Sequence, residues 1–213
     1  MAACAVGRPD PCGAGGDSSR GTRIEFGDDG ASTSVGIPPR TDLGALIHPF
    51  VQICLLRMKP QDLPSSGTLL ALVLAAHTLA GVAVAAVNLG FGQALAAGVI
   101  DTALMCGLTT GLLMLRTLRE RTVQTLTALA GAGAVIGFLA YPVSLWLHDA
   151  HAANEPSPAL GVLLLAVLGW SLAVSAHVLR HALSAPYYIG LLISVAFYWI
   201  SVRILSSLFP LAA

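Results

Sequence analysis

Four ionisable side chains lie inside long apolar stretches of this sequence: His77, Asp101, His177 and Arg203. A charge at the centre of a bilayer is unfavourable by roughly 2.5–3.5 kcal/mol or more, so each of them needs a partner. An imidazole and a carboxylate together can hold a proton or a cation. The first question is therefore which of these groups meet.

Depth along the apolar stretches pairs two of them. His77 lies eleven residues before Asn88, and Asp101 lies ten residues after Phe91. At the rise of an α-helix, both are roughly 15–16 Å from the same end of the membrane. Arg203 is shallower and can reach inward or extend toward the interface. We therefore expect an intramembrane polar cluster of His77 and Asp101, with Arg203 as the second candidate partner of the carboxylate.

Two interpretations of this cluster stay open. In one, His77 and Asp101 form a proton or cation site. In the other, Asp101 is a neutral or paired carboxylate that holds helices together. Broken helices and inverted repeats, which are typical of transporters, are not evident in the sequence. A water-filled cavity that reaches Asp101 distinguishes the two, because a transporter needs one. His177 lies near the end of its stretch with Arg180 and His181, and we expect it at the membrane interface.

Other chemistry finds little support. The sequence contains no H-E-x-x-H, G-x-S-x-G or phosphate-binding glycine loop, and the serines of the apolar stretches have no matching Asp and His. His148 and His151 flank Asp149 but lack further ligands for a metal ion. The sequence predicts a protein that is not an enzyme, with no cofactor and no metal site.

The composition defines the elements that must position these groups. Of the 213 residues, 55% are hydrophobic and 10% charged, whereas soluble domains carry about 25% charged residues. The mean hydropathy is +0.77. A soluble domain could not bury so much apolar surface, so the chain is predicted to be an integral membrane protein. The net charge of zero gives no reason to expect nucleic-acid binding.

Five apolar stretches are long enough to cross the roughly 30 Å of hydrocarbon as helices. They cover residues 66–88, 92–115, 122–147, 159–182 and 186–209. Only helices satisfy the backbone of such segments in lipid. The predicted fold is an all-α polytopic membrane helix bundle, with five transmembrane helices in residues 65–210. The short connections lead us to expect that consecutive helices are antiparallel neighbours.

The N-terminal part reads differently. Residues 1–41 are rich in Gly, Ser, Asp and Arg and are predicted to be a disordered cytoplasmic tail without a cleavable signal peptide. Residues 42–64 contain an apolar pattern at helical spacing, interrupted by Pro49, and are too short to span a membrane. We expect an interfacial amphipathic helix and a linker here; a helix tucked against the bundle is the alternative.

The basic residues predict the orientation. Arg57 and Lys59 precede the first stretch, the connection between the second and third contains three arginines, and the connections around residues 88–91 and 148–158 contain none. By the positive-inside rule the N-terminus is cytoplasmic and the C-terminus outside. The basic residues are ten Arg and one Lys, which together with much Ala and Gly is typical of a GC-rich bacterial genome. The expected location is the bacterial inner (plasma) membrane.

Two pairs of glycines are spaced for close helix packing. Gly107 and Gly111 form one G-x-x-x-G pattern, and Gly133 and Gly137 form another. Such spacing lets helix backbones approach closely. We expect packing within the bundle, with contact between copies of the chain as the alternative.

The layout over residues 42–210 resembles the Yip (Ypt-interacting-protein) family, particularly small bacterial members with a cytoplasmic N-terminal segment and five closely spaced spans. The segments that carry the resemblance are HPFVQICLLRMKPQDLPSS, WSLAVSAHVLRHAL and YYIGLLISVAFYWISVRILSSLFP. The D-L-Y-G-P-type motif of eukaryotic members is missing, so GTPase-linked trafficking is not implied.

The resemblance implies a non-enzymatic membrane protein. The first expectation is a scaffold, an assembly partner or a membrane organiser, whose partners are the lipid bilayer and either other membrane proteins or itself. The alternative is a small transporter or channel component that uses Asp101 and His77.

Overall fold

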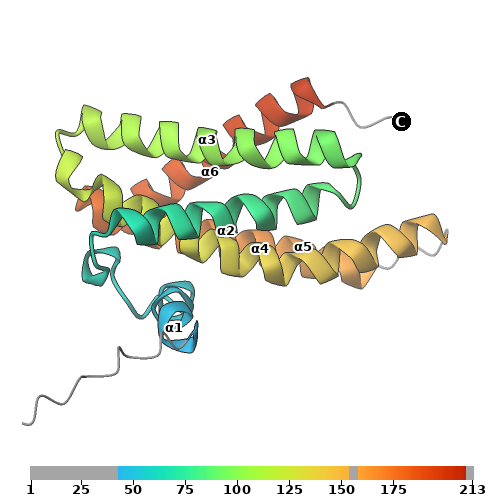
Figure 1. Ribbon diagram of the computed structural model, residues 1–213, viewed down its shortest axis with the longest axis horizontal. Coiled ribbons are helices and arrows are strands. Elements are labelled where there is room, and N and C mark those ends of the chain that lie inside the picture. Colours follow the sequence, from blue (N-terminus) through green and yellow to red (C-terminus); the bar gives the residue numbers. More distant parts are fainter. Residues whose placement is uncertain (1–42, 154–157, 210–213) are drawn as a thin grey trace, which may run out of the picture. The chain divides into compact units, whose positions relative to one another are not determined.

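The computed structural model describes residues 43–153 and 158–209, which all belong to one compact unit of the chain. These residues form helices and contain no strand (Figure 1). The helices are α1 (Leu43–Cys54), α2 (Gly67–Ala85), α3 (Phe91–Leu115), α4 (Thr122–Ala152), α5 (Pro158–Leu183) and α6 (Tyr187–Leu208), with short 3-10 turns η1 (Pro60–Asp62) and η2 (Arg119–Arg121). The predicted tail, residues 1–41, lies outside the described residues.

Five of these helices, α2 to α6, are long and apolar enough to cross a membrane. Their outer faces carry large apolar side chains in the open, such as Leu79, Leu115 and Leu192. Water would not tolerate so much exposed apolar surface, and lipid does. The predicted all-α membrane bundle of five spanning helices is confirmed, and the chain is a multi-pass membrane protein.

The five helices form a ring whose order differs from the order in the sequence. α2 packs against α3 on one side and α4 on the other, α5 lies between α4 and α6, and α6 touches α3. Consecutive spans are in contact, as expected, but α3 meets α4 only slightly, to about the same extent as it meets α6. The main partner of α4 is α2, and the two run parallel, with Gly133 beside His77 and Gly137 beside Ala80. Small residues allow this close approach.

Three helices end in the same way. Leu56 after α1, Thr117 after α3 and Ser184 after α5 all have positive φ angles, at 61°, 58° and 51°. In each case the next amide donates to the carbonyl five residues back, as Leu118 N does to Leu113 O at 2.8 Å. These are Schellman ends, in which a glycine usually occupies the left-handed position.

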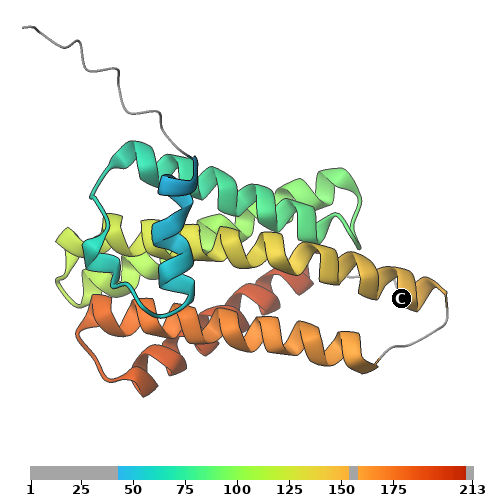
Figure 2. The same cartoon turned by 90° about the horizontal axis from the view of Figure 1, so that it is seen from below.

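The short helix α1 is continuous through Pro49 and packs on the outside of the ring. It crosses α4 and α5 instead of running along them (Figure 2). Phe50 occupies the space left by Gly131, where a Cβ would overlap its ring. The indole nitrogen of Trp170 donates to Cys54 O at 2.9 Å. Burial raises the pKa of the Cys54 thiol to about 11.

Two kinds of residue are exposed on and just after α1. Ile47, Val51 and Leu55 form a partly exposed apolar row along a groove between α1 and the bundle. His48 and Gln52, on the adjoining face, are within 3.3 Å of each other. A helix at the boundary between lipid and water needs both faces. These exposed residues suit the predicted interfacial helix. α1 also packs against the bundle, as the alternative prediction had it.

Candidate functional site

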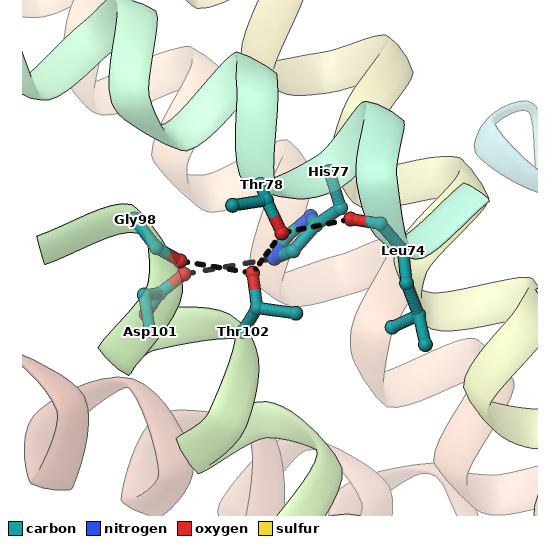
Figure 3. Close-up of polar contacts among 6 residues, drawn as sticks. All are labelled: Leu74, His77, Thr78, Gly98, Asp101 and Thr102. Carbon is teal, nitrogen blue, oxygen red and sulfur yellow. Dashed lines mark hydrogen bonds and ion pairs between the residues drawn. The ribbon is translucent and has the colours of Figure 1, made fainter. Parts of the chain in front are cut away.

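His77 on α2 and Asp101 on α3 face each other near the middle of their helices (Figure 3). The imidazole Nε2 lies 3.6 Å from the carboxylate Oδ2, and the exposed fractions of the two side chains are 16% and 37%. When the imidazole is protonated, the pair is an ion pair with no net charge, which reduces the penalty for a charge in lipid. The structure thus brings together the two residues that depth along the sequence paired.

A second polar pair lies one residue further along each helix. The hydroxyls of Thr78 and Thr102 are 2.9 Å apart. Thr78 Oγ1 is also 2.9 Å from Leu74 O, and Thr102 Oγ1 is 2.9 Å from Gly98 O (Figure 3). Two hydroxyl protons therefore serve three contacts, so at any moment one contact lacks its hydrogen bond. These threonines join α2 to α3 directly beside His77 and Asp101.

Glycines make room for the His77–Asp101 pair on two neighbouring helices. A Cβ at Gly133 on α4 would lie 2.7 Å from Nδ1 of His77. A Cβ at Gly98 on α3 would lie 2.6 Å from a methyl group of Val82 and 3.1 Å from Thr78 O. Real Cβ atoms do not approach so closely. The absence of side chains at these two positions therefore sets the distance between α2 and both of its neighbours.

A hollow of about 610 Å³ lies inside the ring and reaches both His77 and Asp101. All five spanning helices contribute to its wall, which consists mainly of Ala, Gly, Val, Ile and Leu, with Ser171 and Tyr198 as the other polar residues. An adjoining hollow of about 160 Å³ is also lined by His77, Asp101, Ser171 and Tyr198, and adds further serines from α5 and α6. Small-molecule sites in proteins have this size and this mostly apolar lining.

The two ends of the bundle are packed differently. We call the end with Arg57, Lys59, Arg116, Arg119 and Arg121 the basic end, and the opposite one the Asn88 end.

Toward the basic end, Leu113, Leu129 and Leu179 are buried and close the ring. Toward the Asn88 end, a third hollow of about 290 Å³, lined by Asn88, Ser144, His148 and His151, shares Leu164 with the main one. The main hollow and the hollow at the Asn88 end are therefore neighbours along α5.

Arg203 does not join the cluster. Its side chain is exposed on α6, with the guanidinium 5.8 Å from the centre of the Trp199 ring. Asp101 makes no ion pair other than the one with His77 among residues 43–153 and 158–209. A cation on an aromatic face at the outside of the bundle can extend toward the interface, as the sequence allowed.

His177, which we expect near the membrane interface, is covered by another part of the chain. It is 5% exposed, and its ring packs edge-on against that of His181 with the centroids 4.7 Å apart. Its Nε2 is buried without a hydrogen-bond partner. The segment around η1 covers this end of α5, where Gln61 reaches His181 O at 3.4 Å, and this cover explains the burial.

The two glycine pairs have different surroundings. Gly133 and Gly137 both face α2 inside the bundle, as close packing within the bundle requires. A Cβ at Gly107 or Gly111 would meet nothing within 4 Å. Gly107 and Gly111 therefore leave a shallow surface on α3 that no other described helix fills.

The pattern of hydroxyls and single glycines was not evident from the sequence. Thr78 and Thr102 directly follow His77 and Asp101, and that adjacency was the one available signal. Gly98 and Tyr198 gave none, because glycine and tyrosine are common in such helices. Among the described residues no group of three His, Cys, Asp or Glu side chains is placed to hold a metal ion.

Comparison with known proteins adds no assignment. No protein-family model matches this chain, and neither a curated protein nor a solved structure does. The resemblance to the Yip family stays a prediction from the sequence. Functional conclusions therefore come from the geometry of the His77–Asp101 pair and the hollow around it.

Proposed function

We propose that this chain is a small membrane carrier or channel component in which His77 and Asp101 bind the transported species. The observation that carries the proposal is the hollow of about 610 Å³ that His77 and Asp101 line and that extends to Val84 and Ala85, near the Asn88 end. An ionisable pair that only held helices together would need no such space. An intramembrane carboxylate beside a cavity is the usual mark of a substrate or ion pathway.

In this proposal the pair acts by binding and by proton exchange, without enzymatic chemistry, metal or cofactor. Asp101 supplies the negative charge, and His77 supplies a proton that can leave when another cation arrives. In this proposal the buried leucines toward the basic end close the path on that side, and the transported species enters from the Asn88 end. Transport then requires a second conformation in which the basic end opens.

We further propose that the protein lies in the bacterial inner membrane with its basic end in the cytoplasm, so that the hollow opens to the outside. Support comes from the basic residues, because the connections at the Asn88 end contain neither Arg nor Lys among the residues that the structure describes.

Cysteine accessibility tests the proposal. In a background with Cys4, Cys12, Cys54 and Cys106 replaced by serine, one variant carries Ala140→Cys and the matched control carries Leu139→Cys. Ala140 lines the hollow, whereas Leu139 faces outward from the same turn of α4. We expect a membrane-impermeant thiol reagent added outside to modify residue 140 and to spare residue 139. Protection of both positions in an inserted protein would contradict a water-filled path.

A second candidate function is the scaffold or assembly partner that the resemblance implies. One observation favours it: the open surface at Gly107 and Gly111 of α3, which suits a helix of another membrane protein or of a second copy. Native pull-down in mild detergent tests it, with a Gly107→Leu/Gly111→Leu variant as the control. Loss of a specific co-purifying protein in that variant would support the scaffold.

A further inference from the structure

We propose that the hollow binds a monovalent organic cation with an apolar body, whose charge lies on Asp101 in place of the proton of His77. This inference rests on the proposed function and names the class of substrate. It depends on three features: the charge balance of the site, the chemistry of its wall and the aromatic ring beside it.

The charge balance favours a single positive charge. The ionisable side chains that line the two inner hollows are His77 from α2, Asp101 from α3 and the phenol of Tyr198 from α6. The lining residues of α4 and α5 are apolar, glycine or serine. With a protonated imidazole the site is neutral, and with a neutral imidazole it has one negative charge. One bound monocation restores neutrality, whereas a dication would leave an excess and an anion would face the carboxylate.

The wall is poorly suited to the divalent ions Ca²⁺ and Mg²⁺. Ca²⁺ takes 6–8 oxygen ligands, and Mg²⁺ requires six in near-ideal octahedral geometry. Around Asp101 the two inner hollows offer one carboxylate, the hydroxyl of Tyr198 and serine hydroxyls of α5 and α6, but no second carboxylate. A cation with an apolar body needs few oxygen ligands, because its hydrocarbon gains free energy from leaving water for the Leu, Ile and Ala side chains of the wall.

The aromatic ring of Tyr198 adds a second attraction for the same ligand. Tyr198 lines both inner hollows together with Asp101. The face of an aromatic ring attracts organic cations, and this attraction grows when water is excluded. The hollow therefore combines a carboxylate, an aromatic ring and an apolar wall, which together suit a lipophilic ammonium or phosphonium ion.

Binding would exchange the ligand for a proton. The cation enters from the Asn88 end and pairs with the carboxylate of Asp101; the N–H bond of the protonated His77 breaks, and its proton passes to water in the hollow. No other bond changes, and the site stays neutral. Because the ligand and the proton compete for the same pair, a lower pH should weaken binding of the ligand.

The test uses purified full-length protein in lipid nanodiscs and two probes of the same shape, tetraphenylphosphonium and tetraphenylborate. We expect saturable binding of the phosphonium, weaker at pH 6 than at pH 8, and no comparable binding of the borate. Asp101→Asn should weaken phosphonium binding roughly 10- to 100-fold, as expected for the loss of a charged partner. Asp149→Asn, which removes an exposed carboxylate of α4, is the matched control and should bind normally.

His77→Gln keeps the test valid even if Asp101→Asn does not fold. This variant should bind the phosphonium with little dependence on pH, because the exchangeable proton is gone. Equal binding of the two probes, or unchanged binding by a folded Asp101→Asn variant, would overturn the proposal. If neither probe binds while Ala140→Cys is still accessible from outside, the proposed class of substrate is wrong and the proposed carrier function is retained. If that cysteine is protected as well, both proposals are wrong.

Discussion

The imidazole of His77 lies in the space that the missing side chain of Gly133 leaves on α4, with Nδ1 only 2.7 Å from where a Cβ would be. That nitrogen is buried and has no hydrogen-bond partner, while Nε2 faces Asp101. The position of the ring, and through it the pairing of α2 with α3, therefore depends on a glycine of a third helix.

Gly133→Ala should displace the His77 ring and destabilise the bundle by about 1–3 kcal/mol, the usual effect of an extra methyl group in a packed interior. Gly107→Ala is the matched control, since nothing lies within 4 Å of its added Cβ. It should be neutral or stabilise the helix by up to about 1 kcal/mol. The free energy of unfolding in mixed detergent micelles measures both. Equal effects of the two substitutions would show that the packing of His77 does not depend on the missing side chain of Gly133.

The docking of α1 predicts a protected thiol. In a variant with Cys4, Cys12 and Cys106 replaced by serine, Cys54 should resist maleimide at pH 7–8. The side chain is 2% exposed, and because its pKa is raised to about 11, the thiol stays protonated at pH 7–8. Gly131→Leu should push Phe50 out and make Cys54 reactive. Rapid labelling without that substitution would mean that α1 does not stay on the bundle.

The Schellman end of α3 offers a stabilising substitution. Thr117 has a positive φ of 58°, which is unfavourable for a β-branched residue and easy for glycine. Thr117→Gly should raise the free energy of unfolding by about 1 kcal/mol. Thr117→Ala keeps a Cβ and should gain much less, so the difference between the two variants isolates the backbone effect. A destabilised Thr117→Gly protein would contradict the assigned helix end.

The proposed orientation predicts the location of reporter domains. A phosphatase that is active only outside should be inactive when fused after residue 120 and active at residue 152 or at the C-terminus. A fluorescent protein that folds only in the cytoplasm should give the opposite pattern. The reason is the excess of arginine at the basic end. An internal C-terminus would be incompatible with five crossings and an internal N-terminus.

The sequence by itself determined the helices. Apolar stretches of about 20 residues have one backbone solution in lipid, so the five spanning helices follow from hydropathy alone. Level depth on two adjoining helices also paired His77 with Asp101, because a helix rises by a constant amount per residue. Hydropathy is a local property, and the level depth depends only on the short connection between α2 and α3, so both can be read from the order of residues.

The tertiary structure decided which faces meet. The hydropathy of α4 is high all round, so nothing in its pattern indicates that Gly133 faces His77 on α2 and not a residue of α3. For the same reason α1 could be predicted as a helix, while its contact with Gly131 and Trp170 could not. The burial of His177 could not be predicted either, because it depends on the segment around η1 that covers this end of α5.

The hollow is the feature that the sequence could least disclose. It arises where the small side chains of α2, α3 and α4 leave space beside the leucines of α5, and small residues can equally well close a gap. Whether Ala and Gly bring helices together or line a cavity depends on the tilt of each helix against its neighbours, and Gly98 does both. That tilt results from all the contacts of the ring at once, and only the folded chain contains it.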